Sequence, residues 1–225
     1  MTLYGALKST GDLSTNFVLW AEGLFDVPND INKDPFICSN ADYVQKHNPA
    51  AFFANSRNDE CPPTVVWKGW AQGTLPPPPD QLLPTVNLVS KGVAFVMPGQ
   101  DHNGHNGGGP NPTETKVQAW NNWLQGNIPQ YVNYALNKAN KTLLIITQDE
   151  KSGGYCGDAN HIILFLIAGD LQAQTDSTCV GLDTCPGVVP GQAAQYNILR
   201  TITKNFNLAN LGHANTNVPA LIPPL

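Results

Sequence analysis

The stretch LLIITQDEKSGGYCGDANHIILFLIAGD, residues 143–170, decides the fold. Its two apolar runs, LLIIT and HIILFLIAG, are rich in β-branched and long aliphatic residues, so both predict buried strands of a covered sheet. The segment between them is polar and glycine-rich, and two adjacent carboxylates, Asp149 and Glu150, come near its start. Loops at the carboxyl ends of strands carry the chemistry in open α/β sheets, which makes these two residues the first candidates for a functional site.

Further strands are expected before this stretch. TNFVLWA (15–21) and GVAFVMP (92–98) are compact runs of β-branched and aromatic residues, and VVW (65–67) predicts at most a short strand. Between them, residues 26–91 show no sustained periodicity and form a loop-rich excursion. Within it, LPPPPD (75–80) is a semi-rigid connector, because four prolines remove backbone donors and fix φ.

Two helical regions are predicted. After Thr113, a capping residue, apolar positions three or four apart run to Ala139, and Gly126 and Pro129 divide this region into two short helices in near line, with Asn127 capping the second. AAQYNILRTITKNF (193–206) predicts another helix, with one apolar face made of Tyr196, Leu199, Ile202 (or Thr203) and Phe206. The alternation of strands and helices predicts one α/β domain over residues 1–225, with a largely parallel sheet.

Composition narrows the classes of function. The net charge is −5, only 13 % of residues are charged, and no cluster of Lys and Arg exists to neutralise phosphates of a nucleic acid. No apolar run approaches the roughly 20 residues needed to span a bilayer. The first ten residues, MTLYGALKST, contain no apolar core of a signal peptide.

The five cysteines lack the CxxC spacing of a zinc site. Cys179 and Cys185 enclose a short loop, and Cys38 and Cys61 enclose another, so either two disulfides or free buried thiols are consistent with the sequence. Asn140 begins the sequon Asn-Lys-Thr, a possible site of glycosylation. Together these features favour a secreted, oxidising setting.

Four motifs in order resemble one known family. They are FVMPGQDHNGHNGG (95–108), a helix containing W..WL...IP, LLIITQDE followed by NHI, and QYNILRTI..NFNL. Their residue types and order are similar to the phosphoesterase family of secreted acid phosphatases and phospholipases C, and the resemblance covers about residues 1–212. It implies a three-layer α/β/α fold of the alkaline-phosphatase type. The implied activity is metal-dependent hydrolysis of a phosphate ester, either a small molecule or a phospholipid headgroup.

The resemblance also implies site residues. Asp149 and Glu150 match the family's metal-binding Asp-Glu pair, and a cation would relieve the repulsion between neighbouring carboxylates. The identity of the divalent metal ion stays open, and so does the alternative that both residues are solvated loop acids. His105 and His161 match family histidines of the active site. Their alternatives are a flexible loop for His105 and a structural histidine at a strand start for His161.

Additional ligands are possible beside His105, namely Asp101, His102 and Asn103. We expect Asp149, His105 and His161 to converge within reach of one ion.

Two departures from the family pattern predict an impaired enzyme. The family's N-terminal segment, with its metal-binding Glu-Asn and its Ser or Thr nucleophile, has no counterpart here, so the chain resembles the C-terminal two-thirds of the domain. Gln195 stands where the family has a histidine, and glutamine is the poorer metal ligand. The alternative function is a non-catalytic relative that serves as a binding or structural protein.

Overall fold

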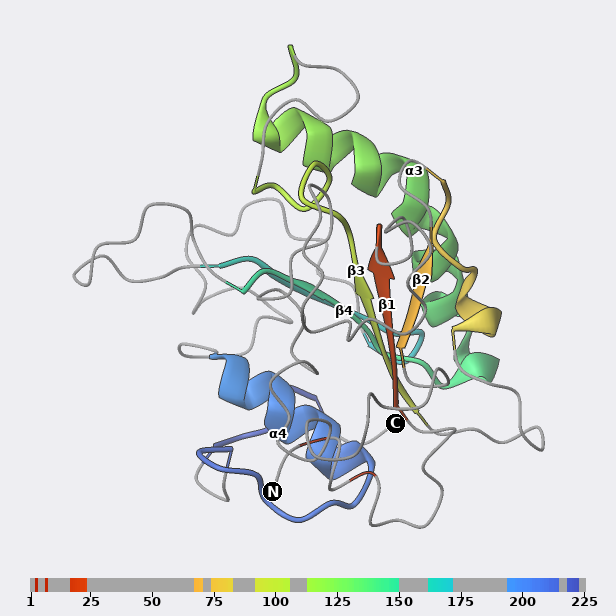
Figure 1. Cartoon of the computed structure of the whole chain (residues 1–225). Helices are drawn as coiled ribbons and strands as arrows, with labels where there is room; N and C mark the ends of the chain where they lie inside the picture. Colours follow the sequence, from red (N-terminus) through yellow and green to blue (C-terminus); the bar gives the residue numbers. More distant parts are fainter. Residues whose placement is uncertain are drawn as a thin grey trace, which may run out of the picture. The chain divides into compact units, whose positions relative to one another are not determined.

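The computed structural model describes residues 3, 7, 17–23, 67–70, 74–82, 92–105, 113–149, 162–171, 194–214 and 218–222, with only the backbone of 67–70 (Figure 1). The chain divides into two compact units, one of residues Thr2–Tyr131 and the other of Val132–Leu225 together with Met1. The boundary falls inside one helix, and each unit is described by itself.

The first unit contains a three-stranded parallel sheet (Figure 1). The strand β1 (Phe17–Glu22) lies between β2 (Trp67–Trp70) and β3 (Val93–Met97), with Leu19 opposite Trp67 and Phe17 opposite Val93. The strands predicted at 15–21 and 92–98 are therefore confirmed. The short strand expected at 65–67 lies slightly later, at 67–70.

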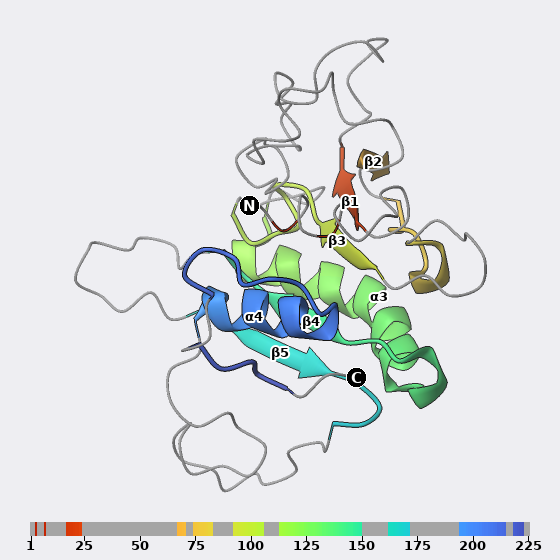
Figure 2. The ribbon, with the colours of Figure 1, turned by 90° about the horizontal axis from the view of Figure 1, so that it is seen from below.

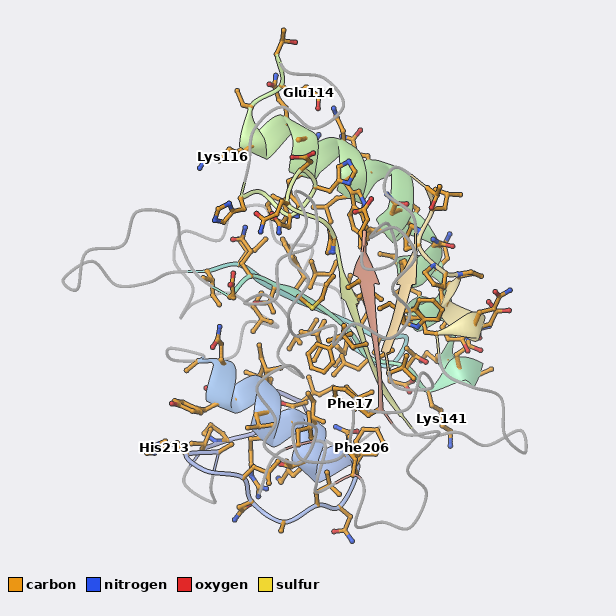
Figure 3. All side chains as sticks on the ribbon, in the orientation of Figure 1. Phe17, Glu114, Lys116, Lys141, Phe206 and His213 are labelled. Carbon is orange, nitrogen blue, oxygen red and sulfur yellow. The ribbon has the colours of Figure 1, made fainter. Side chains whose placement is uncertain are left out.

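The central strand β1 is covered on both faces. Val18 and Leu19 are neighbours that point to opposite faces of the sheet, and both are fully buried. At the start of the strand, the ring of Phe17 lies 5.5 Å from that of Phe95 on β3 (Figure 3). Burial on both faces explains why TNFVLWA reads as an apolar run without polar alternation.

The helix α3 (Lys116–Leu136) is continuous, so the prediction of two short helices was wrong. Gly126 and Pro129 both lie on its exposed side. The opposite side buries every fourth residue, namely Ala119, Trp123, Asn127, Tyr131 and Ala135. Burial of this stripe outweighs the one hydrogen bond that a proline removes.

The two capping residues predicted for this region were also wrong. The helix starts after Thr115, not Thr113: the Gln118 N–H donates to Thr115 Oγ1 at 3.3 Å, and the Thr115 N–H donates to Gln118 Oε1 at 2.9 Å. This reciprocal pair is a capping box. Asn127 lies within the helix, where its Nδ2 donates to the Trp123 carbonyl at 2.7 Å.

The proline-rich connector packs beside this helix and β1. The hydroxyl of Tyr131 donates to the Pro77 carbonyl at 2.6 Å, and Trp20 Nε1 donates to the Leu82 carbonyl at 3.0 Å. A short 3-10 turn, η3 (Pro79–Gln81), ends the run of prolines. Burial raises the pKa of Tyr131 to about 12, because the charged phenolate is disfavoured away from water.

The second unit contains the strands β4 (Leu144–Thr147) and β5 (Leu164–Ile167), where the apolar runs predicted strands (Figure 2). The predicted burial was wrong, because no residue of either strand is buried and Phe165 is 54 % exposed. They pair antiparallel, with Leu144 opposite Ile167 and Thr147 opposite Leu164. We had expected largely parallel neighbours. The three-layer α/β/α fold with a single central sheet stays a prediction.

The turn after β5 contacts the last turn of α3. The Gly169 N–H donates to the Ala135 carbonyl at 2.9 Å, which satisfies one of the carbonyls that a helix end leaves without a partner. Nearby, the 3-10 turn η4 (Lys138–Asn140) leads into β4, and its C-cap Lys141 has a left-handed backbone with φ of 44°.

The helix α4 (Gln195–Asn205) confirms the helix predicted at 193–206, but its buried face is polar. Asn197, Thr201 and Thr203 are buried, whereas Tyr196 is 49 % exposed, so the predicted apolar face was wrong for Tyr196. The reason is the chain segment 218–222. The Leu221 N–H donates to Thr201 Oγ1 at 2.8 Å, and Asn197 Nδ2 donates to the Pro219 carbonyl at 3.0 Å.

Among the described residues, no helix is both long and apolar enough to cross a membrane.

Candidate functional site

The carboxyl end of the parallel sheet brings two loops together. Glu22 is the last residue of β1, and Ala21 beside it pairs with Met97, the last residue of β3. The loop 98–105 therefore starts next to Glu22. It carries the motif Asp101, His102 and Asn103 that the sequence singled out, at the edge where open α/β sheets hold their ligands.

Glu22 and His102 form a buried carboxylate–imidazole pair. The Nδ1 atom of His102 lies 3.0 Å from Glu22 Oε1 and 2.9 Å from Oε2. The side chain of Glu22 is fully buried, and that of His102 is 11 % exposed. A carboxylate can be buried when hydrogen bonds from the protein replace those it made to water, and the imidazole supplies one of them.

Glu22 also has a backbone partner. The Gly99 N–H donates to Glu22 Oε2 at 2.9 Å. The Gly99 carbonyl in turn accepts the N–H groups of His102 and Asn103, at 3.0 and 2.9 Å. One carboxylate thus fixes both the imidazole and the turn that carries it.

The end of the loop has a different local structure. The His105 N–H donates to Asn103 Oδ1 at 2.8 Å, a turn closed by an asparagine side chain. Gly104 between them has a φ of 88°, which glycine adopts without strain. The His105 side chain is exposed, whereas His102 is the histidine buried at the sheet edge.

In the second unit, Asp149 follows β4 and is exposed. Gln195 Nε2, from the first turn of α4, donates to the Asp149 backbone carbonyl at 2.9 Å. Gln195 therefore lies against a predicted metal ligand, although the two residues are far apart in sequence.

Antiparallel pairing also affects the predicted site. It places the end of β4 beside the start of β5, and the hydroxyl of Thr147 donates to the Ile163 carbonyl at 2.9 Å. In a parallel pair these two strand ends would lie at opposite edges. The described residues that enter β5 therefore lie at the same end of the strand pair as Asp149.

Several predicted site residues lie outside the described residues: Glu150, His161, Cys38, Cys61, Cys179 and Cys185. Asn140 of the sequon is described, and its Nδ2 donates to the Tyr134 carbonyl at 2.9 Å. Within the described ranges, no three His, Cys, Asp or Glu side chains come together as a metal site. The described residues around Asp149 therefore do not include a set of ligands for the predicted ion.

Glu22 is the residue that sequence reasoning missed. It ends an apolar β-rich run, FVLWAE, in the same way that Asp149 follows LLIIT. A carboxylate directly after a buried strand was the available signal, and it was used for only one of the two strands.

Comparison of the chain with protein-family models, curated proteins and solved structures finds no match.

Proposed function

We propose that the chain belongs to a phosphate-ester hydrolase of the acid phosphatase or phospholipase C type, with impaired turnover. The observation that carries this proposal is the buried Glu22–His102 pair at the carboxyl end of a parallel sheet. An imidazole held by a carboxylate is suited to move a proton to or from a reacting oxygen.

The loop that carries His102 has a defined local conformation. Gly104 allows its backbone to approach a ligand closely, and the side chain of Asn103 organises the turn through His105.

A divalent ion, when bound, would polarise the phosphoryl oxygens. Asp149 and Glu150 are the residues we propose to hold it, since carboxylate oxygens are ligands for hard cations. Gln195 at the backbone of Asp149 provides a weaker ligand than an imidazole, so we expect weak metal affinity. Because of the Cys pairs and the sequon, the proposed setting is secreted.

The test is hydrolysis of an aryl phosphate and of an aryl phosphocholine by the full chain with added divalent metal. We expect slow turnover of one of them, reduced at least tenfold in His102→Asn. His213→Asn, at an exposed histidine of the second unit, is the matched control and should leave the rate unchanged.

A parallel titration with inorganic phosphate separates the two functions. Phosphate binding without hydrolysis by the unmodified chain would support the non-catalytic relative. A chain that neither binds phosphate nor hydrolyses either ester would overturn the proposal.

A further inference from the structure

We infer that Glu22 is a positioning residue, which selects the ring nitrogen that His102 presents to its ligand. The inference deepens the proposed function and rests on it for the kinetic measurement alone. Both carboxylate oxygens of Glu22 lie within 3.0 Å of Nδ1.

A carboxylate accepts hydrogen bonds and cannot donate them when ionised. With Glu22 ionised, the proton that lies between the two side chains is on Nδ1 of His102. In the neutral imidazole Nε2 is then the nitrogen with a lone pair, and it is the atom able to accept a proton or bind a cation. Glu22 fixes this tautomer without itself touching the ligand.

The bond from Gly99 gives Glu22 a second effect. The same oxygen, Oε2, accepts the Gly99 N–H and contacts His102 Nδ1. Gly99 begins the turn that carries His102, so the position of the imidazole and the conformation of its loop depend on one carboxylate. Rotation of the Glu22 side chain would break both contacts.

The location of Glu22 makes this orientation rigid. It ends the central strand of the sheet, and its side chain has no exposure to solvent. Packing around a side chain on a central strand locks its rotamer, so Glu22 holds its partner in one orientation. Loss of such an orienting partner typically lowers activity or metal affinity by about 10- to 100-fold, as measured for the groups that accept a hydrogen bond from a metal-bound histidine.

The experiment compares Glu22→Gln and Glu22→Ala in the full chain with Glu114→Gln as the matched control. Glu114 lies just before α3 in the same unit, where it accepts a hydrogen bond from Asn122 Nδ2 at 3.1 Å (Figure 3). The ring signals of His102 are measured by nitrogen-15 NMR without metal or substrate, at a pH where the ring is neutral. His102→Asn assigns them by the signals that it removes.

We expect the unmodified chain and Glu114→Gln to show a protonated Nδ1 with a proton signal far downfield. Glu22→Gln should keep this tautomer but move the proton signal upfield, because the acceptor has lost its charge. Glu22→Ala should lose the tautomer preference. If Glu22→Ala does not fold, Glu22→Gln alone decides.

The kinetic measurement follows on the same proteins. Glu22→Gln should lower kcat by about 10- to 100-fold with KM little changed, and Glu114→Gln should change neither. An unmodified chain protonated at Nε2, an unmoved proton signal in Glu22→Gln, or an equal kcat in an active enzyme would overturn the inference. If the unmodified chain does not hydrolyse phosphate esters, the proposed enzyme fails while the NMR result still decides the role of Glu22.

Discussion

At Gly169 a methyl group would lie 2.5 Å from the carbonyl oxygen of Leu136 and 2.7 Å from Cγ of Lys138. Glycine is required here because the turn after β5 approaches the last turn of α3 directly. At Gly126, within α3, an added methyl group would have no atom within 4 Å beyond its neighbours in the helix. The two glycines therefore have different reasons to be present.

We expect Gly169→Ala to lower the free energy of unfolding by about 1–3 kcal/mol, since backbone must move to admit the methyl group. Gly126→Ala should raise it by about 0.5–1 kcal/mol, because alanine has the higher helix propensity. Urea unfolding of both variants measures the difference. A Gly169→Ala protein as stable as the parent would contradict the close approach.

Tyr131 links stability to alkaline pH. Below about pH 10 the phenol is neutral in both the folded and unfolded chain, so it adds no pH dependence. Between about pH 10 and 12 the unfolded chain releases the proton and the folded chain keeps it, so stability falls as pH rises.

We expect Tyr131→Phe to be about 1 kcal/mol less stable than the parent near neutral pH, because the bond to the Pro77 carbonyl is lost. Above pH 10 the parent loses stability, by an amount on the order of 2 kcal/mol at pH 12, so the difference should shrink and then reverse in favour of Tyr131→Phe. Urea unfolding at several pH values measures this, with Tyr134→Phe as the control for loss of one tyrosine. A constant difference across the range would refute the assignment.

At the scale of elements, α4 packs through hydrogen bonds rather than through apolar contacts alone. Thr201 is fully buried, donates to the Asn197 carbonyl at 2.8 Å and accepts the Leu221 N–H. Thr203 is equally buried but only donates, to the Arg200 carbonyl at 3.1 Å. Only the first threonine holds the segment 218–222.

Thr201→Val should therefore cost more than Thr203→Val, about 1–3 kcal/mol against about 1 kcal/mol, because it leaves the Leu221 N–H without its acceptor. Hydrogen exchange at the Leu221 amide should accelerate in Thr201→Val alone. Equal exchange in the two variants would mean that the hydroxyl of Thr201 does not anchor the segment.

The sequence predicted these elements well where burial is apolar and continuous. The run FVLWA, for example, forms a buried strand, since no polar side chain competes for the same face. The burial of Asn197 and Thr201 was not predicted, because their partners, Pro219 and Leu221, are more than a helix length away in sequence. Pro129 was read as a break because its exposed position depends on the packing of α3.

At the scale of the whole molecule, the candidate site was half predicted. His102 was named among the possible ligands, but its carboxylate partner comes from a strand far earlier in the chain. Such a pairing follows from the parallel register of β1 and β3, which local patterns do not contain. The family resemblance, which ordered the other candidates, stays a prediction.

The proposed metal ligand can be tested on the whole chain. Asp149→Ala should weaken divalent-metal binding in calorimetric titration, and Gln195→His should strengthen it, since imidazole is the better ligand beside Asp149. Asp170→Ala is the matched control, because Asp170 is an exposed carboxylate of the same unit that pairs with Lys138 at 3.2 Å. Identical binding by Asp149→Ala and the parent would remove Asp149 from the ligand set.

The strand pairings also set an order of folding. Thr147 and Leu164, which pair between β4 and β5, are near in sequence, whereas Phe17 and Val93, which pair between β1 and β3, are far apart. Distant pairings form slowly, because chain entropy is lost before contacts compensate for it. We expect pulse-labelled hydrogen exchange to protect the amides of β4 and β5 before those of β1 and β3. The Glu22–His102 pair, which depends on the late sheet, would then form only in the last step of folding.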